Sequence, residues 1–135
     1  ELLGKSNIIS LHVPYMKETH HLINMGNIGQ IKKGAYLINT ARGAVVETAA
    51  VVKALEDGIL AGAGLDVLEE EGDMQDEMKL LSGPHPKEEE LKIVLENHYL
   101  IDHPRVIITP HIAFDTREAI ERIPDTTAEN IKSLK

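Results

Sequence analysis

The stretch AYLINTARGAVVETAAVVKALEDGILAGAGLDVL, residues 35–68, decides the fold, because it reads in turn as a strand, a helix and a strand. Residues 35–40 and 59–68 are short apolar runs of the kind that buried strands show. Between them, residues 47–58 repeat apolar side chains at helical spacing and stop at Gly58, a residue favoured just past a helix end. This order predicts two parallel strands joined by a right-handed crossover.

The same alternation continues outward from this unit. The further predicted strands are residues 7–14 and 105–110. The further predicted helices are a short one near residues 26–32 and longer ones over residues 87–100 and 115–134. The helix at 87–100 is expected to turn Leu91, Val94 and Leu95 inward, and the last helix is expected to be interrupted near Pro124. We therefore predict an α/β fold, a partial doubly wound parallel sheet.

The composition is that of a globular domain without a basic surface. The chain has 135 residues and a net charge of −8, which argues against nucleic acid and against anionic membranes as partners. No apolar run reaches membrane-spanning length, and the first ten residues do not read as a secretory signal. The absence of cysteine excludes a disulfide and fits a reducing, cytoplasmic compartment. We expect no metal site, because the histidines lack the spacing of a helical metal pair.

Four ionisable side chains lie at or just past the carboxyl ends of the predicted strands, at the sheet edge where parallel α/β folds bind ligands. They are Arg42, Asp66, Glu71 and His111. Taken singly, each is more often an ordinary surface or turn residue, and only their convergence favours a site. An arginine can hold a carboxylate, and a histidine oriented by a carboxylate can transfer a proton near neutral pH. The set suits a substrate with a carboxylate beside a carbonyl or hydroxyl carbon, and hydride transfer there implies a nicotinamide cofactor.

Three segments carry a family resemblance. They are SLHVPYMKETHHLIN (10–24), INTARGAVVETAAVVKALEDGILAGAGLDVLEEE (38–71) and VIITPHIAFDT (106–116). Together they resemble the D-isomer-specific 2-hydroxyacid dehydrogenases, in particular the D-lactate dehydrogenase branch. The resemblance implies the second half of a Rossmann-type NAD-binding domain, with NAD as cofactor, a small 2-hydroxy or 2-oxo acid as substrate, and a homodimer.

The resemblance also implies roles for particular residues. Arg42 would bind the substrate carboxylate, His111 would be the acid/base, and Glu71 would support His111. The implied cofactor contacts are Val13 and Pro14 beside the adenosine, Thr40 and Ala41 near the nicotinamide ribose, Asp66 on the nicotinamide side, and Thr19 at a further contact position.

Part of the family pattern is absent from this sequence. The phosphate-binding G-x-G-x-x-G loop does not occur; GAG at 62–64 is followed by Val67 at the third glycine position, within a predicted strand. We expect residues 1–112 to be the second half of a dinucleotide-binding domain, with an acidic insertion at about 72–103. Residues 113–135 would form a helical segment that returns toward a substrate domain. The insertion is interpreted as a solvated surface excursion.

Two alternatives remain open from the sequence. The missing glycine loop and the insertion are compatible with a non-catalytic binding or assembly module that retains the fold. A related NAD dehydrogenase could instead act on another acid, such as formate or 3-phosphoglycerate.

Overall fold

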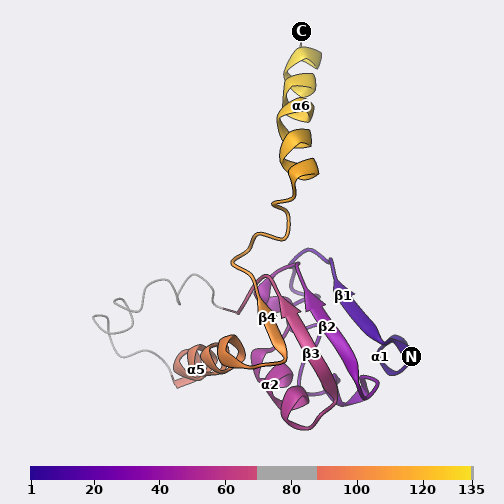
Figure 1. Cartoon of the computed structure of the whole chain (residues 1–135), viewed down its shortest axis with the longest axis vertical. Coiled ribbons are helices and arrows are strands. Elements are labelled where there is room, and N and C mark those ends of the chain that lie inside the picture. Colours follow the sequence, from indigo (N-terminus) through magenta and orange to yellow (C-terminus); the bar gives the residue numbers. More distant parts are fainter. Residues whose placement is uncertain (70–87, 135) are drawn as a thin grey trace.

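A computed structural model gives the fold and describes residues 1–69 and 88–134. One sheet of four strands is built in chain order, so that each strand lies beside the next one in the sequence (Figure 1). The strands are β1 (Ile8–Leu11), β2 (Ala35–Asn39), β3 (Leu60–Leu65) and β4 (Val106–Ile108). All three pairings are parallel, which places the four carboxyl ends on one edge of the sheet. The predicted α/β fold with a parallel sheet is confirmed.

The helical elements connect and cover these strands. Among the described residues they are α1 (Leu2–Lys5), the 3-10 turns η1 (Ile28–Gln30) and η2 (Gly43–Val45), α2 (Thr48–Glu56), α5 (Glu88–Asp102) and α6 (Arg117–Ser133). The predicted crossover from β2 to β3 is α2, which ends before Gly58 at a φ of 66° that suits glycine. The short helix expected near residues 26–32 is the 3-10 turn η1.

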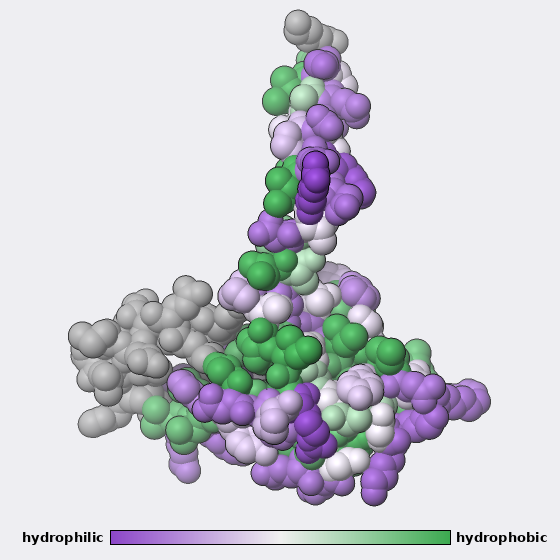
Figure 2. Space-filling model, viewed as in Figure 1, coloured by the Kyte–Doolittle hydropathy of each residue, from purple (hydrophilic) through white to green (hydrophobic). Residues whose placement is uncertain are grey.

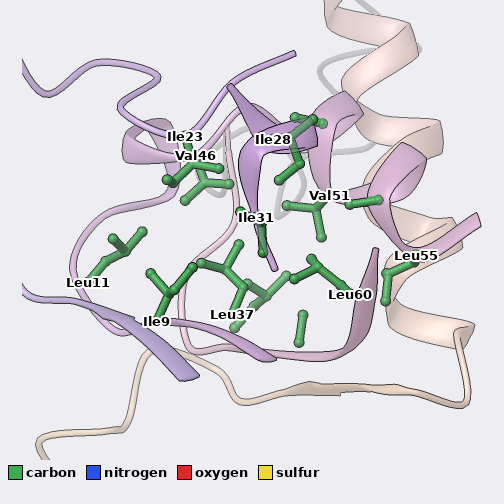
Figure 3. Close-up of a cluster of buried hydrophobic side chains, with 14 of the residues drawn as sticks. Ile9, Leu11, Ile23, Ile28, Ile31, Leu37, Val46, Val51, Leu55 and Leu60 are labelled. Carbon is green, nitrogen blue, oxygen red and sulfur yellow. The ribbon is translucent and has the colours of Figure 1, made fainter. Parts of the chain in front are cut away.

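The core lies on the face of the sheet that α2 covers. Leu37 and Leu60 project from the strands into this layer, and Val51 and Leu55 meet them from α2. Figure 3 shows these side chains with the isoleucines of the connection between β1 and β2. Each fully buried aliphatic side chain of this kind contributes roughly 1.5–3 kcal/mol relative to its exposed state. The core therefore fixes β2 and β3, the two strands that lead into Arg42 and Asp66.

The opposite face of the sheet is exposed in the part of the chain that the structure describes. Ile8, Tyr36 and Ile107 are 61%, 52% and 71% exposed, respectively. Figure 2 shows hydrophobic side chains gathered over the strands in the same view. A doubly wound sheet covers both faces with helices, so this apolar face agrees with a partial rather than a complete sheet of that kind.

Helix α5 corrects two expectations. Leu91 and Leu95, which were expected to turn inward, are 43% and 71% exposed, whereas Asn97 and Leu100 are buried. Helix α5 contacts α2 and β4; its buried residues lie in its last turns, and its first turns extend beyond the sheet (Figure 1). Residues 88–102 are therefore part of the packed domain, which contradicts a purely solvated excursion. The rest of the acidic insertion, from 72 to 87, lies outside the described residues.

Helix α6 corrects a third expectation, because it runs from Arg117 to Ser133 without a break at Pro124. The fixed φ of proline matches helical geometry, and the cost is the hydrogen bond that its missing N–H would have given to the Ile120 carbonyl. Thr116 caps the helix by accepting a hydrogen bond from the Ala119 N–H at 3.2 Å. The helix extends away from the sheet and buries none of its residues (Figure 1).

No helix in the described ranges combines the length and the hydropathy that crossing a membrane requires.

Candidate functional site

The turn that carries Arg42 is built by Asn39, the last residue of β2. Asn39 is 1% exposed, accepts the Ala41 N–H at its Oδ1 and donates from Nδ2 to the Arg42 carbonyl, each at 3.0 Å. A side-chain amide suits this position because it offers both an acceptor and donors. The turn is thus held from inside the core, and the Arg42 side chain extends outward from it.

The Arg42 guanidinium is exposed and keeps most of its donors available. It donates one hydrogen bond, from Nη1 to the Ala41 carbonyl at 2.6 Å. Within residues 1–69 and 88–134 it forms no ion pair with a carboxylate. A guanidinium with free donors on a fixed turn can bind a carboxylate through two parallel hydrogen bonds.

A cleft of about 540 Å³ opens beside the Arg42 turn. Its walls come from the segment after β1 and the turn after β2, namely His12, Val13, Pro14, Tyr15, Thr40, Ala41 and Arg42. The structure therefore brings together four predicted cofactor contacts and the predicted carboxylate ligand. Val13 and Pro14 offer an apolar wall, and the Thr40 hydroxyl offers a polar one, which is the mixed chemistry that a nucleotide site needs.

Asp66 organises the loop that carries His111. Its Oδ1 accepts the Thr109 hydroxyl at 2.5 Å and the Ile112 N–H at 2.9 Å. Its Oδ2 accepts the Ala113 N–H at 2.9 Å, and its carbonyl accepts the His111 N–H at 2.9 Å. These bonds hold His111 at a φ of 55°, a left-handed conformation that residues other than glycine seldom adopt.

The charge of Asp66 follows from the same contacts. Burial alone would raise the pKa of this carboxyl. The hydrogen bonds from Thr109, Ala113 and Ile112, together with the charge of His111, outweigh burial and hold the pKa below its ordinary value of 3.8. Asp66 is therefore ionised at neutral pH, and the contact of Asp66 with the nicotinamide side stays a prediction.

Of the predicted site residues that the structure describes, Thr19, Asp66 and His111 do not line the cleft. Glu71 falls outside the described residues. Thr19 does not line the cleft; its hydroxyl donates to the Pro14 carbonyl at 2.7 Å and accepts the Met16 N–H at 2.8 Å. Thr19 thus shapes the loop on which Pro14 lies, and a direct cofactor contact by Thr19 stays a prediction.

Sequence reasoning missed His12, Tyr15 and Glu69. His12 lies between the ends of β1 and β2, with Nε2 2.7 Å from the Ser10 hydroxyl and Nδ1 3.5 Å from that of Thr40. The order HVP after an apolar strand was the available signal for His12 and Tyr15, since both border the predicted contacts Val13 and Pro14. Glu69 lies in an acidic run that gives no sign of its burial. In the described part of the chain, no three His, Asp or Glu side chains are grouped to hold a metal ion.

Comparison with known proteins identifies the family of this domain. The chain belongs to the D-isomer specific 2-hydroxyacid dehydrogenases, because the model of that family's NAD binding domain matches residues 1–113. The expected family and Rossmann-type fold are confirmed.

Individual relatives agree with this assignment. A glyoxylate reductase of Thermofilum pendens is 46% identical over 130 residues, a match that covers 96% of this chain and 32% of that protein. A D-lactate dehydrogenase of Treponema pallidum is 45% identical over 126 residues, covering 91% of this chain and 35% of that protein. The crystal structure of the D-lactate dehydrogenase of Aquifex aeolicus, complexed with NAD and lactic acid, superposes with a TM-score of 0.76 at 44% identity. It covers 98% of this chain and 38% of the other. The chain thus spans about a third of the length of these relatives.

Proposed function

We propose that this chain is part of an NAD-dependent enzyme that interconverts D-2-hydroxy acids and 2-oxo acids. The observation that carries the proposal is the single cleft in which Arg42 lies beside four of the predicted cofactor contacts. His111 lies on the same edge of the sheet, because it follows β4, which is parallel to β3. The family match and the NAD-bound relative support NAD as the cofactor.

Each predicted site residue would have its own role in such a reaction. NAD, when bound, supplies and accepts the hydride. Arg42 binds the substrate carboxylate and so orients the neighbouring carbonyl carbon. His111 gives a proton to the carbonyl oxygen during reduction and removes it during oxidation. Asp66 fixes the loop of His111, and Glu71 would support His111 as the family resemblance implies.

The wider setting belongs to the same proposal. Residues 1–112 would be the second half of the dinucleotide-binding domain, and residues 113–135 a segment leading toward a substrate domain. The absence of any buried residue in α6 agrees with a segment whose partner lies elsewhere. A cytoplasmic homodimer is supported by the family resemblance alone.

Replacement of Arg42 tests the proposal in the complete product of the gene that encodes this chain. Arg42→Gln leaves a polar side chain but removes the charge and the two parallel donors, so KM for 2-oxo acids should rise by about 100-fold. KM for NADH should stay within about twofold, because the cleft walls from β1 are unchanged. Lys33→Gln is the matched control, since this exposed cation precedes β2 at the opposite edge of the sheet. Near-normal turnover of Arg42→Gln would remove the assigned role.

Replacement of His111 tests its role in proton transfer separately from the binding of the two ligands. His111→Gln should lower kcat by about 10²–10⁴-fold while the 2-oxo acid and NADH still bind, because only proton transfer is lost. Steady-state kinetics with calorimetric binding of each ligand would show the difference. Retained activity would contradict the acid/base role.

A further inference from the structure

A buried carboxylate that the proposed reaction does not use lies just beyond β3. Glu69 is 7% exposed. Its Oε2 accepts both the N–H and the hydroxyl of Thr48 at 2.8 Å, and its Oε1 accepts His21 Nε2 at 2.5 Å. Its carbonyl accepts Asn97 Nδ2 at 2.9 Å. Glu69 therefore joins the loop after β1, the start of α2, the end of β3 and the helix α5.

The contact with Thr48 replaces an ordinary helix cap. Thr48 is the first residue of α2, and the preceding Glu47 forms no side-chain cap. The Glu47 carboxylate instead accepts the Met25 N–H at 2.7 Å. The start of a helix has unpaired N–H groups and favours negative charge. The Glu69 carboxylate, 21 residues farther along the chain, accepts one of these N–H groups and supplies the negative charge.

The backbone around Glu69 also touches the turn of Arg42. An added Cβ at Gly43 would lie 1.9 Å from the Leu68 carbonyl oxygen and 2.6 Å from the Glu69 nitrogen. The residue after Arg42 therefore packs directly on the chain at Leu68–Glu69, at a separation that only glycine allows.

The histidine bound to Glu69 reaches the same turn from the other side. The His21 N–H donates to the Ala44 carbonyl at 2.9 Å, two residues after Arg42. His21 has a φ of 48°, so its left-handed backbone is held in place by this bond and by the pairing of its ring with Glu69. Glu69 thus connects the two contacts that flank the Arg42 turn. One is the hydrogen bond from the His21 N–H to the Ala44 carbonyl, and the other is the close approach of Leu68 to Gly43.

We propose that Glu69, through His21 and Thr48, is a positioning residue that sets the place of Arg42 for the substrate carboxylate. This inference rests on the proposed function, because it needs Arg42 to bind the substrate. Glu69 itself does not touch the substrate; it fixes the backbone from which the guanidinium extends. Small displacements of a binding group are costly to a reaction that depends on orientation.

The test uses Glu69→Ala and Glu69→Gln in the complete gene product, with pyruvate and glyoxylate as probes. Glu69→Ala removes all three side-chain bonds, so KM for the 2-oxo acid should rise by about tenfold while KM for NADH stays within about twofold. Glu69→Gln can still accept from Thr48 and donate to a neutral His21, so it should restore most of the affinity. Glu89→Ala is the control, since this exposed carboxylate lines the same recess as Glu69 and should leave both constants unchanged.

The outcomes separate this inference from the proposed function. A role limited to stability would lower kcat with the folded fraction and leave KM for the 2-oxo acid unchanged, which would overturn the inference alone. A Glu69→Gln variant as impaired in KM as Glu69→Ala would also overturn it, because the retained hydrogen bonds would then position nothing. A wild-type protein that reduces no 2-oxo acid would overturn both proposals.

Discussion

The replacement Gly43→Ala should displace the Arg42 turn by an amount that the structure defines. The new Cβ would lie 1.9 Å from the Leu68 carbonyl oxygen, whereas ordinary contact needs at least 3.4 Å, so the two backbones must part by about 1.5 Å. Both are held, the turn by Asn39 and the Leu68–Glu69 segment by Thr48 and Asn97. Overpacking of this kind costs about 1–3 kcal/mol of stability. A misplacement of about 1 Å can reduce catalysis by about 100-fold.

The assay pairs urea unfolding with steady-state reduction of a 2-oxo acid by NADH in the complete gene product. Gly29→Ala is the matched control, because a Cβ at Gly29 meets nothing within 4 Å and its backbone is not left-handed. The control should keep full activity and change stability by less than about 1 kcal/mol. We expect kcat/KM of Gly43→Ala to fall by about 100-fold at denaturant-free conditions where the protein remains folded. A folded Gly43→Ala variant with the kcat/KM of the control would refute the tight contact between the two segments.

Three further predictions concern the site loop, the core and the Arg42 turn. Asp66→Asn should cost about 1–3 kcal/mol at neutral pH, because one loop N–H loses its acceptor. The pKa of Asp66 is lower in the folded state than its ordinary value of 3.8, so the ionised carboxylate stabilises the folded protein. This contribution is full above pH 3.8 and is lost as the pH falls through the folded-state pKa. Unfolding free energies of wild type and Asp66→Asn should therefore converge in acid, and a gap that stays constant down to about pH 2 would contradict this. Leu37→Ala should lower the free energy of unfolding by about 2–5 kcal/mol, because Leu37 is fully buried. Replacement of the exposed Leu95 by Ala should lower it by less than about 0.5 kcal/mol. Equal effects of the two replacements in urea titrations would contradict the assigned core. In Asn39→Asp the ionised carboxylate has no N–H to donate to the Arg42 carbonyl. This variant should therefore raise KM for the 2-oxo acid with little change in KM for NADH. Unaltered kinetics would show that the Arg42 turn does not need Asn39.

The strands and the site edge were predictable because local pattern determines them. Apolar runs bounded by glycine, proline and polar residues marked all four strands, and parallel pairing then placed Arg42, Asp66 and His111 on one edge. The cofactor contacts along the cleft came from the family resemblance, since nothing local distinguishes Val13 or Ala41 from other apolar residues.

Packing across distant segments was not predictable. Leu91 and Leu95 have the spacing of a buried stripe, yet the buried residues of α5 are Asn97 and Leu100 in its last turns. Pro124 was expected to interrupt α6, because a local rule cannot weigh one lost hydrogen bond against a whole helix. Glu69 lies in a run of acids that reads as solvated charge, and its burial depends on His21, Thr48 and Asn97, which are remote in sequence.

The most direct measurement is NADH oxidation by the complete gene product with two matched sets of compounds. One set contains 2-oxo acids, such as glyoxylate and pyruvate, and the other contains ketones of similar size without a carboxylate. We predict turnover with the 2-oxo acids and none with the ketones, because Arg42 selects the carboxylate. Absence of NADH oxidation with every 2-oxo acid, or equal rates with the uncharged ketones, would contradict the account.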